Sequence, residues 1–291
     1  MPANSNIPLI RNQLYECIKE GFYGGLVDVY STYATNCYYY DVNSLYPFAM
    51  LKALPVGKPR YHRQITNLDN FFGYINVKVT SPKGDHVPIL PFKSKYGLLA
   101  PVGTWCGMYF SEEIKEAIKY GYNFDLLDGF EFDLGFIFES YVNDLYEIKR
   151  NATGVKRFIS KLGLNALYGK MGSRPIESNT QLVNYETLST LSLNSFFEVG
   201  DNLFLADVPL PHGPLYRSCV SVPIAGAITA YSRTIINYYK TLPGNSIIYS
   251  DTDSAVLTQP LDPKFITSDI GDMKLEYNVL EGVFLGPKMY G

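Results

Sequence analysis

Residues 246–257 read Ser-Ile-Ile-Tyr-Ser-Asp-Thr-Asp-Ser-Ala-Val-Leu, and this stretch decides the expected fold. Two short apolar runs flank an acidic turn, a pattern that predicts a β-hairpin. Because side chains at i and i+2 of a strand point to one face, the carboxylates of Asp251 and Asp253 are expected to converge. Paired carboxylates at a strand end suit Mg²⁺, which takes few protein ligands and leaves the rest to water and phosphates. Two alternatives stay open for this pair alone: a turn that hydrogen-bonds its own backbone, or the metal site of a sugar-nucleotide glycosyltransferase.

A third carboxylate, Asp41, ends a tyrosine-rich strand predicted over residues 36–41. An unpaired charge in such a strand costs several kcal/mol of desolvation, so Asp41 requires a partner or a metal ion. A short helix is predicted to open at Ser44, with Pro47 in its first turn, where proline is tolerated. Capping of that helix is the alternative role for Asp41.

Elsewhere the hydrophobic periods predict a mixture of helices and strands. Strands or a hairpin are predicted at residues 72–80, 97–107 and 273–284. Helices are predicted from Ser111 and over residues 136–150, 155–170 and 222–239. The pattern of residues 173–217 is irregular, which indicates an excursion from the core. The predicted fold class is therefore α+β with an antiparallel sheet.

The formal net charge is −3, but the charges are unevenly distributed along the chain. Residues 111–148 hold ten acidic and two basic side chains, whereas residues 149–174 hold seven basic and no acidic ones. Such a basic segment is expected to bind a polyanion, although a solvated basic helix face is the alternative.

Part of this basic segment forms a polar stripe on one helix face. Four residues recur there at i, i+4, i+8 and i+11: Arg157, Lys161, Asn165 and Tyr168. Phosphates are expected to bind this stripe. Lys149, at the end of the preceding helix, either joins the stripe or interacts with its own helix dipole.

The composition, 46% hydrophobic and 18% charged, excludes a mainly disordered chain. The four cysteines have neither zinc-binding nor disulfide-framework spacing: Cys17, Cys37, Cys106 and Cys219. We expect them to be reduced, mostly buried thiols. No apolar run reaches the roughly 20 residues needed to cross a bilayer, so a soluble chain without a membrane partner is expected.

Three motifs resemble those of family B DNA polymerases and occur in the family's order. Residues 41–47, Asp-Val-Asn-Ser-Leu-Tyr-Pro, resemble motif A, and residues 249–254, Tyr-Ser-Asp-Thr-Asp-Ser, match motif C. Residues 161–169, Lys-Leu-Gly-Leu-Asn-Ala-Leu-Tyr-Gly, resemble motif B, with Ala166 in place of its serine. Together the motifs favour a polymerase over the alternatives that each carboxylate leaves open by itself.

Two further motifs resemble those of the protein-primed branch of this family. Lys288-Met289-Tyr290 is similar to its Lys-x-Tyr motif, and residues 22–25, Phe-Tyr-Gly-Gly, resemble its Tyr-x-Gly-Gly linker. The long stretches between the motifs resemble two insertions that contact the terminal protein and the template. The overall likeness is to the polymerases of linear mitochondrial plasmids of fungi and plants, in a fragment without exonuclease and thumb.

The resemblance implies a polymerase palm with an antiparallel sheet, helical fingers and two insertions. The implied segments are a linker and the first part of the palm with motif A (1–60), an insertion resembling terminal-protein region 1 (61–135), the fingers with motif B (136–172), a second insertion (173–217), and the remainder of the palm with motif C and Lys-x-Tyr (218–291).

The resemblance also implies the chemistry. Two Mg²⁺ ions, or Mn²⁺, are expected to be held by Asp41 and Asp253, with Asp251 in support, while a primer or terminal-protein hydroxyl attacks a dNTP. The implied partners are DNA template and primer, a dNTP and a terminal protein, and the implied location is the mitochondrion. An inactive remnant that only binds DNA or a terminal protein is the alternative.

Further residues are implied to bind the substrates. Those implied for the nucleotide are Ser44, Leu45, Tyr46, Lys149, Arg157, Lys161, Asn165 and Tyr168. Those implied for primer and template are Gly24, Gly25, Tyr249, Thr252, Lys288 and Tyr290. A rigid aromatic ring at Tyr46 is expected to exclude the 2′-hydroxyl of a ribonucleotide.

Overall fold

The computed structural model describes residues 6–173, 178–210 and 220–291. The chain forms two compact units, of which the first comprises Met1–Gly172 and Ser221–Gly291 and the second Ser173–Val220. Within the described residues, no helix is both long and apolar enough to cross a membrane. Cys17, Cys37 and Cys106 are free thiols, as predicted, and Cys219 lies outside the described residues. The expectation that they are mostly buried was wrong, because of these three only Cys37 is buried and Cys106 is exposed.

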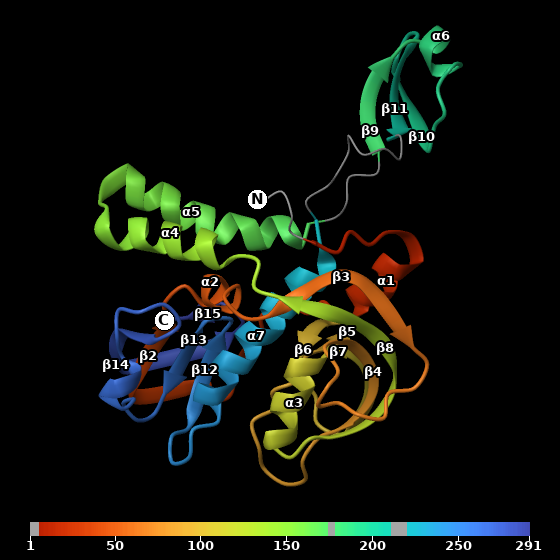
Figure 1. Ribbon diagram of the computed structural model, residues 1–291. Coiled ribbons are helices and arrows are strands. Elements are labelled where there is room, and N and C mark those ends of the chain that lie inside the picture. The colour runs from red at the N-terminus through yellow and green to blue at the C-terminus, as the bar shows by residue number, and fades with distance from the viewer. Residues whose placement is uncertain (1–5, 174–177, 211–219) are drawn as a thin grey trace. The chain divides into compact units, whose positions relative to one another are not determined.

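The first unit is built on a six-stranded antiparallel sheet, which confirms the predicted α+β fold class (Figure 1). In spatial order its strands are β1 (Val27–Val29), β12 (Ile247–Asp251), β13 (Ser254–Leu257), β2 (Tyr33–Val42), β14 (Met273–Gly286) and β15 (Met289–Tyr290). The hairpin predicted around the acidic turn is β12–β13, and it lies in the middle of the sheet. A short 3₁₀ helix, Pro263–Phe265, lies between β13 and β14.

Helix α7 (Val222–Lys240) is the core helix that the sequence predicted. Its apolar residues are buried on nearly all sides, and Pro223 occupies the first turn, where no hydrogen bond is lost. Figure 1 shows α7 running between two sheets, and it contacts both β13 and β3 (Leu54–His62). Four further helices pack on it: α1 (Asn12–Glu20), α2 (Leu45–Ala49), α3 (Ser111–Lys119) and α5 (Gly154–Met171).

A second sheet of four antiparallel strands has the order β3-β8-β4-β7. Its other strands are β8 (Asn123–Gly135), β4 (Gly73–Thr80) and β7 (Thr104–Phe110). The hairpin predicted within residues 97–107 was misplaced, because the hairpin is formed by β5 (Phe92–Ser94) and β6 (Gly97–Leu99). The following strand, β7, pairs instead with β4, a partner that local sequence does not indicate.

The two helices predicted around the basic segment are α4 (Glu139–Asn151) and α5 (Gly154–Met171). They form a helical hairpin, drawn in light green in Figure 1. The hydroxyl of Tyr141 in α4 donates a hydrogen bond of 2.8 Å to the carbonyl of Gly163 in α5. This contact closes the hairpin where α5 carries a glycine instead of a bulkier side chain.

The second unit contains a three-stranded antiparallel sheet, where the sequence showed only an irregular pattern. Its elements are β9 (Ser178–Val183), α6 (Tyr185–Leu188), β10 (Ser195–Gly200) and β11 (Leu203–Pro209). Strand β10 is exposed along its whole length, so neither of its faces has to be apolar. Its sequence therefore lacks the alternation of apolar and polar residues by which a strand is recognised. The remainder of the irregular segment, 174–177 and 211–217, lies outside the described residues.

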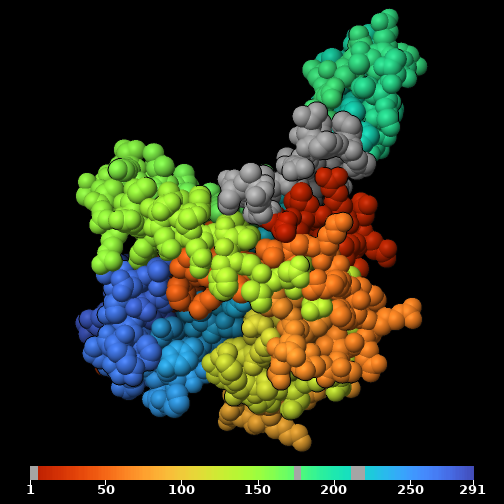
Figure 2. Space-filling model, viewed as in Figure 1, coloured from red at the N-terminus to blue at the C-terminus, as the bar shows by residue number. Residues whose placement is uncertain are grey.

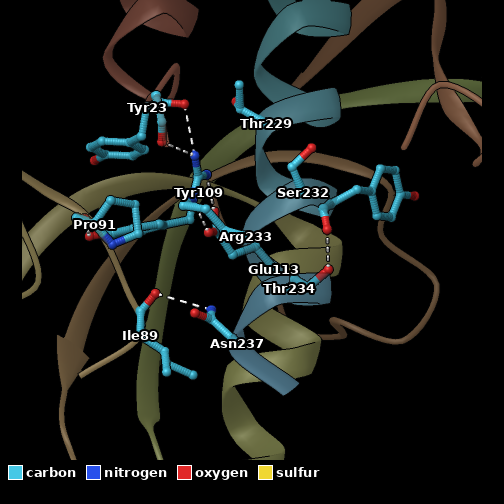
Figure 3. Close-up of polar contacts among 12 residues, drawn as sticks. Tyr23, Ile89, Pro91, Tyr109, Glu113, Thr229, Ser232, Arg233, Thr234 and Asn237 are labelled. Atoms are coloured by element: carbon cyan, nitrogen blue, oxygen red, sulfur yellow. Dashed lines mark hydrogen bonds and ion pairs between the residues drawn. The ribbon is translucent and has the colours of Figure 1, made fainter. Parts of the chain in front are cut away.

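A buried ion pair joins α7 to α3. Arg233 and Glu113 each have a side chain that is 2% exposed, and Arg233 Nε lies 2.6 Å from Glu113 Oε1. Arg233 Nη2 donates a second hydrogen bond of 2.8 Å to Glu113 Oε2 (Figure 3). The contact therefore fixes α3, together with strand β7 that directly precedes it, to the core helix.

We predict that Glu113→Ala lowers the free energy of unfolding by about 3–5 kcal/mol, because it leaves the buried guanidinium unpaired. Urea unfolding followed by circular dichroism measures the loss. The matched control is Glu112→Ala, which removes a partly exposed carboxylate paired with Lys115 at 2.7 Å and should cost less than about 1 kcal/mol. Equal losses in the two variants would contradict this account of Arg233.

Candidate active site

The pairing of three strands places Asp41 beside the acidic turn. Asp41 lies in β2 opposite Ser254 of β13 on one side and Lys274 of β14 on the other. The amide of Val42 donates a hydrogen bond of 2.8 Å to the carbonyl of Asp253. Segments more than 200 residues apart in the chain are thus fixed side by side by backbone hydrogen bonds.

The carboxylates of Asp41 and Asp253 disfavour each other's charge. Burial, together with the charge of Asp253 and then of Glu276, raises the pKa of Asp41 from 3.8 to about 7. Burial, followed by the charge of Asp251, also raises the pKa of Asp253. In the described part of the chain neither Asp41 nor Asp253 forms an ion pair with a cationic side chain. A cation at this position would therefore relieve the repulsion and restore both carboxylates to the charged form.

Asp251 has a different environment from the other two aspartates. Its Oδ2 accepts a hydrogen bond of 2.6 Å from Lys288 Nζ, and its Oδ1 accepts one of 3.1 Å from the Thr252 hydroxyl. Strand β12 ends at Asp251, and Asp253 lies in the turn, so the alternation that the sequence argument applied does not extend across this pair. Asp251 is thereby tied to the Lys-x-Tyr segment, while Asp253 lies close enough to Asp41 for its charge to raise the pKa of that carboxyl.

Cationic side chains from α4 and α5 lie near Asp41. Lys149 Nζ donates a hydrogen bond of 2.6 Å to the hydroxyl of Ser44, three residues beyond Asp41. Burial, and then the charges of Lys161 and Arg157, lower the pKa of Lys149. The charge of Lys161 in turn acts on the carboxyl of Asp41. The basic stripe predicted from the sequence is therefore directed at the acidic site.

A polar cavity of about 370 Å³ opens beside this cluster. It is lined by Asn43, Tyr146, Lys149, Arg150, Arg157, Thr267, Ser268 and Lys274. The Tyr146 hydroxyl donates a hydrogen bond of 2.8 Å to the carbonyl of Ser268. Arg150 Nη1 lies 3.7 Å from Asp269 Oδ1. In Figure 2 the green surface of α4 and α5 adjoins the blue surface of the loop before β14. Four cationic side chains thus surround a space that fits an anionic ligand.

Two tyrosines, one from motif A and one from motif B, stack on each other near Asp253. The rings of Tyr46 and Tyr168 are 4.3 Å apart and nearly parallel, at 10°. Burial, and then the neighbouring Tyr168, raises the pKa of Tyr46. Leu45 is only 2% exposed and belongs to the core, so its side chain does not reach this surface, whereas Asn165 is exposed on α5. Both stacked rings are partly buried and pack against the core of the first unit.

The residues implied for primer and template form a second group around Asp251. The rings of Tyr249 and Tyr290 lie 5.2 Å apart, and the Tyr249 hydroxyl accepts a hydrogen bond of 3.0 Å from the amide of Lys288. Gly25 lies against Thr252, whose hydroxyl oxygen would be 2.6 Å from a Cβ built on that glycine. The structure thus brings motif C, the Lys-x-Tyr segment and the glycine linker together.

Sequence reasoning missed two charged neighbours of Asp41. Lys274 and Glu276 lie on β14 and are joined by a contact of 2.8 Å, and both alter the pKa of Asp41. Only the register of β14 against β2 reveals them. Arg233 was also missed, although a charged residue in an otherwise apolar helix was a signal that could have been followed.

The donor set fits a divalent cation at Asp41 and Asp253. Mg²⁺ commonly binds one or two protein carboxylates and completes its shell with water and phosphate oxygens. Two half-buried carboxylates that repel one another are such a pair. Within residues 6–173, 178–210 and 220–291 no group of three His, Cys, Asp or Glu side chains is placed so that it could hold a metal ion.

The comparison with protein families identifies the class. The family model described as DNA polymerase type B, organellar and viral, matches residues 1–269. The chain therefore belongs to the organellar and viral type B DNA polymerases.

Individual polymerases are similar to this chain in sequence or in fold. A probable DNA polymerase of Neurospora intermedia is 35% identical over 98% of this chain and 32% of its own length. A probable DNA polymerase of Podospora anserina is 33% identical over 98% of the chain and 27% of its own length. The chain therefore spans about a third of the length of these relatives. Among solved structures, Phi29 DNA polymerase superposes with a TM-score of 0.75 at 21% identity over 98% of this chain and 51% of its own, a likeness of fold.

The raised pKa of Asp41 predicts how stability depends on pH in metal-free protein. Between about pH 4 and pH 7 the folded chain holds a proton on Asp41 that the unfolded chain releases, so the free energy of unfolding falls as the pH rises. Asp41→Asn should remove this part of the slope and make the variant more stable than the parent at pH 8. Urea unfolding in EDTA at several pH values tests this.

The matched control for the pH experiment is Asp69→Asn, at an exposed position outside the site. It should retain the parent's slope. Parallel slopes for Asp41→Asn and the parent would show that Asp41 titrates normally.

Proposed function

We propose that this chain carries the polymerase site of a DNA-directed DNA polymerase of the protein-primed kind. The observation that carries the proposal is the pair Asp41 and Asp253, half-buried and mutually repelling, with Lys149 and Lys161 directed toward it. Acidic groups that bind metal ions and cationic groups that bind a triphosphate are both needed for nucleotidyl transfer. Family membership and the names of the fungal relatives support this reading.

In this proposal Asp41 and Asp253 hold two Mg²⁺ ions, which, when bound, acidify the attacking hydroxyl and stabilise the pyrophosphate that leaves. Lys149, Lys161 and Arg157 bind the triphosphate and neutralise its charge. Asp251 orients Lys288 beside the primer terminus. The substrate is a dNTP, and the hydroxyl belongs to a primer 3′ end or, at initiation, to a terminal protein.

DNA as a partner is supported by a solved structure of similar fold. Phi29 DNA polymerase complexed with primer-template DNA and incoming nucleotide superposes with a TM-score of 0.73. Action on a linear plasmid-like DNA in the mitochondrion is the finer part of the proposal. It is supported by the organellar description of the family and by the fungal origin of the relatives.

We predict that Asp253→Asn reduces dNTP incorporation to background while folding and DNA binding stay near the parent's, because the amide keeps the shape and loses the charge. Primer extension with radiolabelled dNTP and a filter-binding assay measure the two properties. The matched control, Asp262→Asn, removes a surface carboxylate paired with Lys264 and should incorporate normally. DNA binding without incorporation by the parent would instead favour a non-catalytic remnant.

We predict that Tyr46→Val raises ribonucleotide relative to deoxyribonucleotide incorporation by well over about tenfold, because the rigid ring stacked on Tyr168 leaves no room for a 2′-hydroxyl. Single-nucleotide extension with matched rNTP and dNTP measures the ratio. Tyr46→Phe keeps the ring and should keep the discrimination. An unchanged ratio in an active Tyr46→Val variant would return Tyr46 to a packing role.

A further inference from the structure

The guanidinium of Arg233 is buried at the centre of the first unit and takes no part in the proposed reaction. Besides Glu113, it holds two backbone carbonyls. Arg233 Nη1 donates hydrogen bonds of 2.7 Å to the carbonyl of Tyr23 and 2.9 Å to that of Gly24 (Figure 3). The Tyr23 ring, which lies under the guanidinium at 5.7 Å, also stacks on Tyr109 at 5.2 Å.

Stability alone does not explain this arrangement. Replacing a buried ion pair by apolar residues of similar volume is often neutral or stabilising, because the desolvation of two charges offsets their attraction. Apolar side chains, however, cannot hold the carbonyls of Tyr23 and Gly24 in place. What the pair Arg233–Glu113 supplies is a fixed position for that stretch of backbone.

The held backbone leads directly to the catalytic turn. Gly25 packs against Thr252 so closely that a Cβ on the glycine would lie 2.6 Å from the Thr252 hydroxyl oxygen and 2.9 Å from its Cβ. The carbonyl of Leu26 accepts a hydrogen bond of 2.9 Å from the amide of Thr252. One residue further, Val27 of β1 pairs with Asp251. Residues 25–27 therefore form the support on which the turn lies.

That turn needs a support. Thr252 has φ of +58°, a left-handed conformation that is unfavourable for a β-branched residue and costs about 1–3 kcal/mol. Such a conformation persists only where the surroundings hold it. Its neighbours on either side are Asp251 and Asp253, so relaxation of Thr252 would move both carboxylates.

We propose that Arg233, oriented by Glu113, is a positioning residue for the polymerase site. By holding the carbonyls of Tyr23 and Gly24 it presses Gly25 and Leu26 against Thr252 and so fixes where Asp253 meets Asp41. The proposal rests on the proposed polymerase function for its catalytic consequence. The coupling between Arg233 and the turn is a separate claim that can be measured without activity.

The first test is hydrogen exchange in the intact chain. The double variant Arg233→Met with Glu113→Leu replaces both charges by apolar groups of similar size. We expect the amide of Thr252 to exchange about tenfold faster than in the parent, while α7 stays protected and the melting temperature stays close to the parent's. The matched control is Asn237→Leu, one turn along the same helix, which removes a hydrogen bond of 3.3 Å to Ile89 and should leave Thr252 unchanged.

The second test is steady-state primer extension by the same variants. A misplaced carboxylate lowers kcat by about 10²-fold, whereas the dNTP KM and the affinity for DNA stay near the parent's, because the cationic residues on α4 and α5 are untouched. A merely structural role for Arg233 would lower the amount of folded protein, so kcat normalised to the folded fraction measured by circular dichroism would stay at the parent's value. Asn237→Leu should retain the parent's kcat.

The variant Gly25→Ala keeps the Arg233–Glu113 ion pair and disturbs the turn at Thr252 directly. We expect it to speed exchange at Thr252 and to lower kcat, and it decides the matter if the double variant does not fold. Folded variants with the parent's exchange at Thr252 and the parent's kcat would overturn the proposal. A parent chain that incorporates no dNTP overturns the proposed function, while faster exchange at Thr252 would still establish the coupling.

Discussion

Asp41 and Asp253 repel one another, and the pairing of β2 with β13 holds them together against that repulsion. The backbone hydrogen bond from Val42 to Asp253 fixes the approach, and burial raises the pKa of both carboxyls. Neither carboxylate is neutralised by an ion pair within the described residues. A cation bound between them would relieve this repulsion, so the pair fits the divalent cation of the proposed function. The rest of the first unit can be understood as the scaffold that keeps this pair in place.

The scaffold acts from two sides. Helices α4 and α5 bring a cationic surface toward the carboxylates, so a polyanionic ligand meets complementary charge at the same place. From the opposite side, the glycine linker lies under the left-handed turn at Thr252, and Arg233 holds the linker. The second of these supports departs from local rules twice, because Arg233 is a buried arginine in an apolar helix and Thr252 is a β-branched residue at positive φ. Such violations concentrate where function requires them.

The second unit shows where local patterns mislead. Its strand β10 presents apolar residues such as Phe197 to solvent, so no alternation marks it as a strand. The misplaced hairpin in residues 97–107 has a related cause, since β7 finds its partner in β4 through tertiary packing. In contrast, α7, α4 and α5 were predicted to within a few residues, because an apolar or basic helical period is a local property. The expected alternation of Asp251 and Asp253 along one strand was wrong, because β12 ends at Asp251.

The sequence by itself determined the α+β class, the order of the motifs, the acidic hairpin and the basic helix, because each depends on spacing along a few residues. It also named the residues that meet at the site, by their resemblance to polymerase motifs. Only the tertiary structure decided that the charge of Asp253 lies beside Asp41 while Asp251 accepts a hydrogen bond from Lys288. It alone placed Lys274 and Glu276 on the adjoining strand and Arg233 beneath the glycine linker. Strand register and buried hydrogen bonds join segments hundreds of residues apart, and no local period encodes which segments those are.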